Sequence, residues 1–350
     1  MLRRAPLAIL PLWLLLCAAL AILSGGRAAL AAAGPAGEAV TFDDTPLTEP
    51  LEHPDWFKHS FLDLPRDLEE AKTAGKRGLI VYFGQARCAY CKMLLQHALA
   101  LPDVQAYARA HFDVVPIDIW GLQEVTDLDG KVLTERDFAV REGLNFTPSL
   151  VFYDTMGRPA LRLRGYYPPY KLRAALEFVA DGHHRRETFA AYLARGDAGL
   201  RFEPGDLIDE PFFLPPPHML DRSRVPGQRP LLVVFEQGDC HACDVLHTQP
   251  LRDPGIRNLL EQFDAVQLDA RSDTPVVTPD GRRTTARQWA EDLGLFYTPS
   301  LLFYDEEGWE IMRVDSVVHF FRLRNVMQYV LARGYLEEPN YQRWRMVSER

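Results

Sequence analysis

The sequence has no surplus of positive charge. Its 39 Lys and Arg residues are outnumbered by 48 Asp and Glu residues, which gives a formal net charge of −9. Binding to nucleic-acid phosphates requires a basic surface, and the single basic run, "HHRR" at 183–186, is too short to provide one. The chain also has no low-complexity tract, and 47% of its residues are hydrophobic, as in globular proteins. The composition therefore argues against a nucleic-acid partner and indicates a folded chain long enough for two domains.

Cysteine is scarce, with five residues in 350. Cys17 lies in the apolar N-terminal segment, and the other four form two C-x-x-C pairs, Cys88 with Cys91 and Cys240 with Cys243. An exported domain held together by structural disulfides would distribute its cysteines along the sequence. Their concentration in two close pairs indicates redox chemistry.

The N-terminal segment resembles an export signal. "MLRR" supplies positive charge, Ala5 to Leu23 is largely apolar, and "SGGRAALAAAG" supplies small residues ahead of a cleavage point before Gly34. This layout predicts a signal peptide over residues 1–33. The alternative is an uncleaved membrane anchor, because the apolar stretch approaches the roughly 20 residues that span a bilayer. In both cases we expect the body of the protein to be exported, with membrane contact only through an uncleaved segment.

The chain repeats itself over the length of a domain. "GLIVYFGQARCAYC" (78–91) matches "PLLVVFEQGDCHAC" (230–243), and "LNFTPSLVFYDTMG" (144–157) matches "LFYTPSLLFYDEEG" (295–308). The displacement is 152 residues at the cysteines (88 to 240) and 151 at the Thr-Pro pairs (147 to 298). Such close agreement indicates a duplicated domain and not a solenoid of small units.

Each copy predicts the element order β-α-β-α-β-β-α. Apolar runs predict buried strands, and threonines with an acid or amide three residues later predict capped helix starts. In the first copy we expect a strand at 79–83, a helix at 92–100 ended by Pro102, a strand at 114–119, a turn at Asp129-Gly130, a helix from Thr134 and a hairpin after Thr147-Pro148. In the second we expect a strand at 231–235, a helix at 244–249 ended by Pro250, a strand at 265–268, a turn at Asp280-Gly281, a helix from Thr285 and a hairpin after Thr298-Pro299.

This order predicts two tandem α/β sandwich domains, each with a central mixed sheet flanked by helices. The stretch that joins them contains "EPGDLIDEPFFLPPPHML", which is rich in proline and acidic residues and has no sustained period, as in a linker. We therefore divide the chain into a signal peptide at 1–33, a first domain with an N-terminal extension at 34–182, a linker at 183–228, a second domain at 229–336 and a C-terminal tail at 337–350.

The first cysteine of each pair has the position of a nucleophile. A strand that ends in C-x-x-C and continues into a helix places Cys88 and Cys240 at a helix N-terminus, where free N–H groups and the helix dipole stabilise a thiolate. Cys91 and Cys243 are then the resolving thiols, which attack the mixed disulfide. The disulfides themselves are the redox groups, so no further cofactor is expected.

Two metal-binding alternatives also use paired cysteines. Two C-x-x-C pairs can form one four-sulfur zinc site, although such pairs are normally separated by a short spacer and not by a whole domain. Copper(I) carriage by a thiolate pair is the stronger rival, because soft ligands suit that ion. The sequence has no Met-rich or His-rich cluster to accompany such a site.

C-x-x-C after a buried strand, followed by Thr-Pro before a later strand, resembles the thioredoxin fold in tandem. The stretch "HPDWFKHSFLDLPRDLEEAKTAGKRGLIVYF" ahead of the first pair is similar to exported SoxW-like thioredoxins, over about 53–182 and 230–335. The resemblance implies that Pro148 and Pro299 are cis prolines that face the cysteine pairs and expose backbone for a substrate strand. It also implies that Thr147 and Thr298 help to tune the disulfides.

The resemblance further implies a periplasmic thiol–disulfide oxidoreductase with protein dithiol or disulfide clients and a membrane or soluble thiol reductant. A disulfide isomerase or oxidase has the same fold and differs in reduction potential, so the direction of electron flow stays open. The two sites can act in series or in parallel. The chain departs from the family because W-C-G-P-C is absent and Tyr82 and Val234 replace the buried acid six residues before each pair. Thioredoxin-like base assistance to the second thiol is therefore in doubt.

The two cysteine pairs differ in their charged neighbours, which predicts different acidities. Arg87 precedes Cys88, whereas Asp239 precedes Cys240, and His241 offsets that negative charge only when it is protonated. We expect Cys88 to have the lower thiol pKa. Alkylation rates measured against pH, in variants that keep one reduced pair each, check this order, and a more acidic Cys240 would contradict it.

Overall fold

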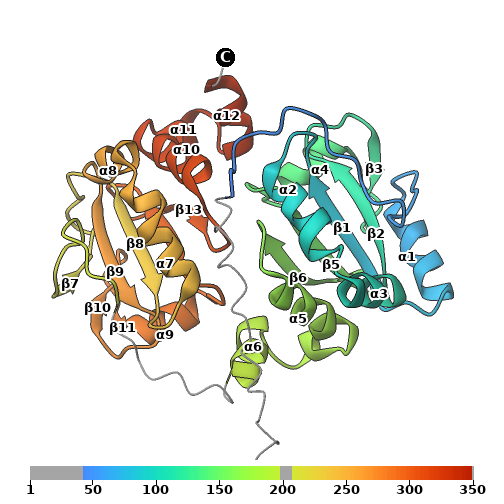
Figure 1. The fold of residues 1–350 in the computed structure, drawn as a ribbon, viewed down its shortest axis with the longest axis horizontal. Helices are drawn as coiled ribbons and strands as arrows, with labels where there is room; N and C mark the ends of the chain where they lie inside the picture. The colour runs from blue at the N-terminus through green and yellow to red at the C-terminus, as the bar shows by residue number, and fades with distance from the viewer. Residues whose placement is uncertain (1–41, 198–206, 349–350) are drawn as a thin grey trace, which may run out of the picture. The chain divides into compact units, whose positions relative to one another are not determined.

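Two four-stranded sheets form the framework of the protein, one in each copy of the repeat (Figure 1). The computed structural model describes residues 42–197 and 207–348, and the described residues from 43 onward form one compact unit. The strand orders are β2-β1-β5-β6 in the first sheet and β13-β12-β8-β9 in the second. In each sheet one pair of strands is parallel and the other pairs are antiparallel. The predicted α/β class and the mixed sheets are confirmed.

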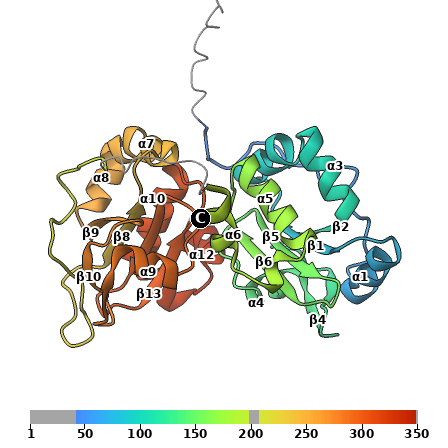
Figure 2. The ribbon, with the colours of Figure 1, turned by 90° about the horizontal axis from the view of Figure 1, so that it is seen from below.

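The helices cover both faces of each sheet, and Figure 2 shows α3 and α4 on opposite sides of β1 and β2. The elements of the first copy are α1 (Leu64–Thr73), β1 (Gly78–Gly84), α2 (Ala89–Met93), the π-helical turn η1 (Leu94–Ala98), α3 (Pro102–His111), β2 (Phe112–Asp118), β3 (Glu124–Thr126), β4 (Val132–Thr134), α4 (Glu135–Arg141), β5 (Ser149–Asp154), β6 (Pro159–Arg164) and α5 (Pro169–Ala180). After them come the short turn η2 (His183–Arg185) and α6 (Phe189–Asp197).

The second copy repeats this order with small changes. Its elements are β7 (His218–Met219), β8 (Leu231–Glu236), α7 (His241–Thr248), η3 (Pro250–Arg252), α8 (Pro254–Leu260), β9 (Asp264–Asp269), β10 (Pro275–Val277), β11 (Arg283–Thr285), α9 (Ala286–Asp292), β12 (Ser300–Tyr304), β13 (Glu310–Val314), α10 (Phe320–Leu331), α11 (Gly334–Glu337) and α12 (Tyr341–Ser348). The strands lie within about two residues of the positions that their apolar runs predict.

Both predicted threonine caps begin helices. The Thr134 hydroxyl accepts a hydrogen bond from the backbone N–H of Asp137 (3.1 Å), and the Thr285 hydroxyl accepts one from Gln288 (3.2 Å). Each bond satisfies an N–H group that the first turn of a helix would otherwise leave without a partner. The repeat therefore conserves a local helix signal as well as the strands.

The helix that follows each cysteine pair begins earlier than predicted, because the first cysteine itself is the N-cap. In the first copy α2 starts at Ala89 and its continuation η1 is π-helical, and in the second α7 starts at His241. Pro102 and Pro250 do not end these helices. They occupy the first turn of the next ones, where the missing N–H is not needed.

The joining segment and the C-terminal residues contain more structure than their sequences suggest. Within 183–228 the described part includes α6 and β7, and β7 pairs with β10 at the edge of a small sheet. Residues 337–350 were expected to be a tail, but α12 lies there, and its Tyr341 is buried against Tyr329 and Phe146. Aromatic burial explains why this short, charged segment is held in place.

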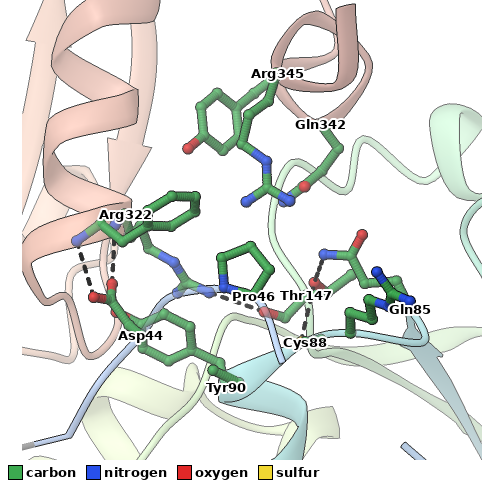
Figure 3. Close-up of a pocket in the computed structure, with 13 residues that line it drawn as sticks. Asp44, Pro46, Gln85, Cys88, Tyr90, Thr147, Arg322, Gln342 and Arg345 are labelled. Atoms are coloured by element: carbon green, nitrogen blue, oxygen red, sulfur yellow. Dashed lines mark hydrogen bonds between the residues drawn. The ribbon is translucent and has the colours of Figure 1, made fainter. Parts of the chain in front are cut away.

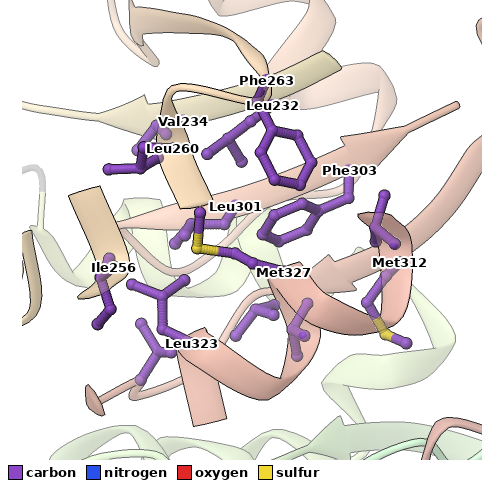
Figure 4. Close-up of a cluster of buried hydrophobic side chains, with 14 of the residues drawn as sticks. Leu232, Val234, Ile256, Leu260, Phe263, Leu301, Phe303, Met312, Leu323 and Met327 are labelled. Carbon is purple, nitrogen blue, oxygen red and sulfur yellow. The ribbon is translucent and has the colours of Figure 1, made fainter. Parts of the chain in front are cut away.

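The core of the second domain is a cluster of aliphatic and aromatic side chains between the sheet and helices α7, α8 and α10 (Figure 4). Phe303 on the central strand β12 is fully buried, and its ring meets that of Phe263 edge to face at 5.7 Å. Such a ring contributes both its buried area and an aromatic pair to stability.

Phe303→Ala should lower the free energy of unfolding by about 3–5 kcal/mol, because it leaves a cavity at the centre of this cluster. Urea denaturation followed by circular dichroism measures the loss. Phe61→Ala is the control, since Phe61 is 92% exposed and its truncation should change stability little. A loss below about 1 kcal/mol for Phe303→Ala would contradict the assignment of Phe303 to the core.

Candidate active site

Each C-x-x-C pair forms a disulfide at the start of a helix. Cys88 is bonded to Cys91 and Cys240 to Cys243, with Cα–Cα distances of 5.1 Å in both pairs. The first sulfur accepts a hydrogen bond from the backbone N–H of the second cysteine, at 2.9 Å in the first pair and 3.1 Å in the second. After reduction, the same N–H groups and the helix dipole stabilise a thiolate at Cys88 and at Cys240.

The structure brings each disulfide together with its Thr-Pro pair. Cys88 Sγ lies 3.3 Å from the Thr147 hydroxyl, and Cys240 Sγ lies 3.6 Å from both the hydroxyl and the carbonyl oxygen of Thr298. The peptide bonds before Pro148 and Pro299 are both cis, as the resemblance implied. The two sites belong to separate sheets, whereas a four-sulfur zinc site would need all four cysteines at one place.

A series of side-chain hydrogen bonds orients Thr147 in the first site. Trp120 Nε1 donates to Gln85 Oε1 (2.8 Å), and Gln85 Nε2 donates to the Thr147 hydroxyl (2.9 Å). Because this hydroxyl accepts from Gln85, its own proton is free to point at the Cys88 sulfur. No described side chain makes the matching bond to the Thr298 hydroxyl in the second site. Glutamine stands at the matching position, 237, in the second copy, but Arg271 replaces Trp120, so the sequence does carry a signal for this difference.

A small cavity of about 30 Å³ opens beside Cys88 and is lined by residues of both domains (Figure 3). Asp44, from the segment ahead of α1, accepts hydrogen bonds from the Tyr90 hydroxyl (2.8 Å) and from the backbone N–H groups of Phe321 and Arg322 (both 2.9 Å). The Tyr90 hydroxyl in turn accepts a bond from the backbone N–H of His319 (2.9 Å). The start of α10 is thereby fixed against the first cysteine pair.

The two residues expected to tune the thiols lie at the surface. Arg87 is exposed at the mouth of the cavity beside Cys88, and His241 is exposed at the first position of α7. Neither side chain forms a hydrogen bond or an ion pair with another residue in the described part of the chain. Any effect of Arg87 and His241 on the thiol pKa values of the reduced pairs therefore acts through space. The predicted effect stays a prediction.

A buried acid–histidine cluster in the second domain was missed by the sequence analysis. His247 Nε2 lies 3.1 Å from both carboxylate oxygens of Glu236, and its Nδ1 lies 3.5 Å from Glu210 Oε1. All three side chains are almost fully buried, and His247 follows Cys243 by one helical turn. Val234 occupies the position at which the family carries a buried acid. The acid of this domain, Glu236, lies two residues later on the same face of β8.

A family model for the thioredoxin-like domain matches the chain twice, over residues 64–180 and 217–331. The chain belongs to the thioredoxin-like family. The predicted tandem arrangement is confirmed, and a thioredoxin-like fold with two C-x-x-C motifs is suited to thiol–disulfide exchange. The expected signal peptide or anchor, residues 1–33, lies outside the described residues. In 42–197 and 207–348, no helix combines the length and the apolar content that crossing a bilayer requires.

Several solved structures of thioredoxin-like proteins are similar to single domains of this chain. A thioredoxin-fold protein from Helicobacter pylori is 21% identical over 41% of this chain and 93% of its own, with a TM-score of 0.35. A thioredoxin from Thermus thermophilus is 23% identical over 36% and 93%, with a TM-score of 0.27. A DsbH oxidoreductase is 15% identical over 44% and 92%, with a TM-score of 0.24. No curated protein matches the chain.

The buried cluster predicts a pH dependence of stability. Burial alone lowers the pKa of His247, but the hydrogen bond to Glu236 and the charges of Glu236 and Glu210 outweigh it, so the pKa is raised. A raised pKa in the folded state stabilises the fold fully below the unfolded value of about 6.5, and this contribution is lost as pH rises through the folded value.

His247→Leu, which introduces the residue found at the matching position in the first domain (Leu95), should destabilise the second domain by about 3–5 kcal/mol at pH 6, because the buried Glu236 carboxylate loses its histidine partner. Glu210 keeps its ion pairs with Arg252 and Arg257. The difference from wild type should shrink as pH rises. Urea denaturation from pH 5.5 to 9 measures it, with exposed His97→Leu as the control. A difference that is constant over this range would show that His247 acts through packing alone.

Proposed function

We propose that the protein is an exported thiol–disulfide oxidoreductase that reduces disulfides of protein clients, in the manner of SoxW-like thioredoxins. The observation that carries the proposal is the geometry of both sites. In each, the first cysteine caps a helix, bonds to the second cysteine one turn later and faces a Thr–cis-Pro pair. The negative net charge and the shortness of the basic run at 183–186 favour protein clients over nucleic acid.

In the reaction we propose, a reduced pair transfers two electrons and two protons to the client. The thiolate of the first cysteine attacks one sulfur of the client disulfide, which forms a mixed disulfide and releases the other client sulfur as a thiolate. The second cysteine loses its proton and attacks the mixed disulfide. The client leaves as a dithiol, and the C-x-x-C pair is left as the disulfide seen in the structure.

A second thiol compound must return the pair to the dithiol state. We propose that this reductant is a membrane or soluble dithiol protein, which becomes oxidised to its own disulfide. The N-terminal signal-like segment supports a periplasmic location, either free or held at the inner membrane. Because that compartment is oxidising, the pairs need such a reductant to return to the dithiol state.

Insulin reduction with dithiothreitol as the electron source tests this function. Wild type should accelerate insulin precipitation well above the reagent alone, and replacement of all four C-x-x-C cysteines by serine should abolish the acceleration. Cys243→Ser, which leaves Cys240 without its resolving thiol, should trap a mixed disulfide with the client, visible in a non-reducing gel. A quadruple variant as active as wild type would overturn the proposal.

The direction of electron flow has its own test. Equilibration of each pair with glutathione buffers, followed by thiol trapping, gives the two reduction potentials. A reductase should have potentials below that of the glutathione pool, so both pairs should stay largely oxidised in glutathione buffers and become reduced only by a stronger dithiol such as dithiothreitol. Values well above the pool would assign the protein to the oxidases or isomerases instead.

A further inference from the structure

The backbone acceptor beside the first disulfide is occupied by a residue of the second domain. Arg322 on α10 donates from Nη2 to the carbonyl oxygen of Thr147, at 2.9 Å (Figure 3). The next carbonyl, that of Pro148, accepts from the backbone N–H of Gly165 (2.9 Å). A polypeptide that docks as an extra strand needs free backbone groups on its host. The backbone acceptors next to Cys88 are therefore already in use.

Arg322 is held in this position by contacts on several sides. Its guanidinium lies over the ring of Tyr90 at 3.5 Å and over that of Phe146 at 5.0 Å, and it also donates to the carbonyl of Val317 (3.4 Å). The side chain is buried, and among the residues that the structure describes no carboxylate forms an ion pair with it. A buried charge without an ion pair is costly, so carbonyl oxygens and ring faces determine where this one lies.

The rest of the first site is closed in the same way. Thr147, Ala89 and Tyr90 are 2%, 5% and 4% exposed. The cavity beside Cys88, at about 30 Å³, has room for only about one or two water molecules. A polypeptide strand cannot pair with the Thr147 carbonyl unless Arg322 leaves it.

The second site differs in the exposure of its motif and in what contacts its threonine carbonyl. Cys240 is nearly as buried as Cys88, but its neighbours in the motif, His241 and Ala242, are exposed and half-buried. Thr298 is half-buried, and no side chain from the first domain donates to its carbonyl oxygen in the described part of the chain. Lys171, which matches Arg322 in the repeat (171 to 322), donates instead to the carbonyl of Phe296. Among the described residues, no donor from the first domain therefore occupies the backbone acceptor at Thr298, where a client strand can pair.

We propose that Arg322 is a specificity-determining residue, which excludes extended polypeptides from the Cys88–Cys91 site and leaves the Cys240–Cys243 site as the one that reduces protein disulfides. The inference rests on the proposed function and deepens it, because it assigns the protein clients to one of the two sites. In this reaction the Cys240 thiolate attacks the client disulfide to form a mixed disulfide, and Cys243 attacks that mixed disulfide and releases the client as a dithiol.

Variants of the full-length chain with one active site each test the assignment. Cys240→Ser/Cys243→Ser keeps only the first site, and Cys88→Ser/Cys91→Ser keeps only the second. Two substrates are compared, insulin as the polypeptide disulfide and hydroxyethyl disulfide as a small one. We expect the second-site chain to keep most of the wild-type insulin rate, and the first-site chain to fall below about a tenth of it, a difference equivalent to about 1.4 kcal/mol.

Arg322→Ala in the first-site chain should then raise the ratio of the insulin rate to the hydroxyethyl disulfide rate by about tenfold. Arg322→Lys should give a smaller rise, because lysine keeps the charge but lacks the planar fork that stacks on Tyr90. Arg324→Ala, which removes a partly exposed arginine from the same helix, is the matched control and should leave the ratio unchanged.

Three outcomes are distinguishable. Equal insulin rates for the two single-site chains, or an unchanged ratio in both Arg322 variants, would overturn the inference while the proposed function stands. If neither single-site chain nor wild type reduces either substrate, the proposed function fails, and the inference fails with it. Thermal unfolding of each variant identifies loss of folding, and Arg322→Lys decides the result if Arg322→Ala does not fold.

Discussion

The hydrogen bond between a cysteine sulfur and the first turn of a helix is the contact on which both sites depend. It makes the first cysteine the N-cap, which fixes where α2 and α7 begin and puts the second cysteine one turn away, within reach of a disulfide. It also provides the positive end of a helix for the charge that forms on reduction. The same bond therefore sets the local structure and the chemistry.

The two domains of the repeat have the same fold, but the surroundings of their cysteine pairs differ. Their contact uses equivalent positions: Gly165 lies against Ser316, 151 residues later, and the backbone N–H of Val317 donates to the carbonyl of Tyr166 (3.1 Å). A Cβ atom at Gly165 would lie 2.1 Å from the Ser316 hydroxyl, so this approach requires glycine. Lys171 and Arg322 occupy matching positions of the repeat near this contact, but they differ in residue type and in the carbonyl they bind. Arg322 donates to Thr147, and Lys171 donates to Phe296.

Much of the fold and of both redox centres could be predicted from the sequence, because the signals are local. Apolar runs placed the strands, threonine caps placed α4 and α9, and the paired motifs located the disulfides and the cis prolines. The helix that follows the first motif was less predictable, because its N-cap is a cysteine, a residue that capping rules do not favour. Its second half is π-helical, for which the sequence had no signal.

Several features that the sequence did not predict depend on contacts between distant residues. Asp44 and Arg322 are 278 positions apart, and nothing in either neighbourhood indicates that they meet beside Tyr90. The buried Glu236 was not predicted because the family carries its acid at the position of Val234. Glu236 lies two residues later, on the same face of β8. The burial of α12 depends on Tyr341 meeting a loop of the other domain, which no local pattern encodes.

The hydrogen bonds of Tyr341 and Gln342 to Asn145 have a consequence for the order of assembly. These residues are synthesised well after the first dithiol and its sheet. A nascent chain that has folded only its first repeat therefore has an uncovered dithiol, open to any disulfide partner it meets. Only when α12 forms and docks does that centre acquire its finished surroundings.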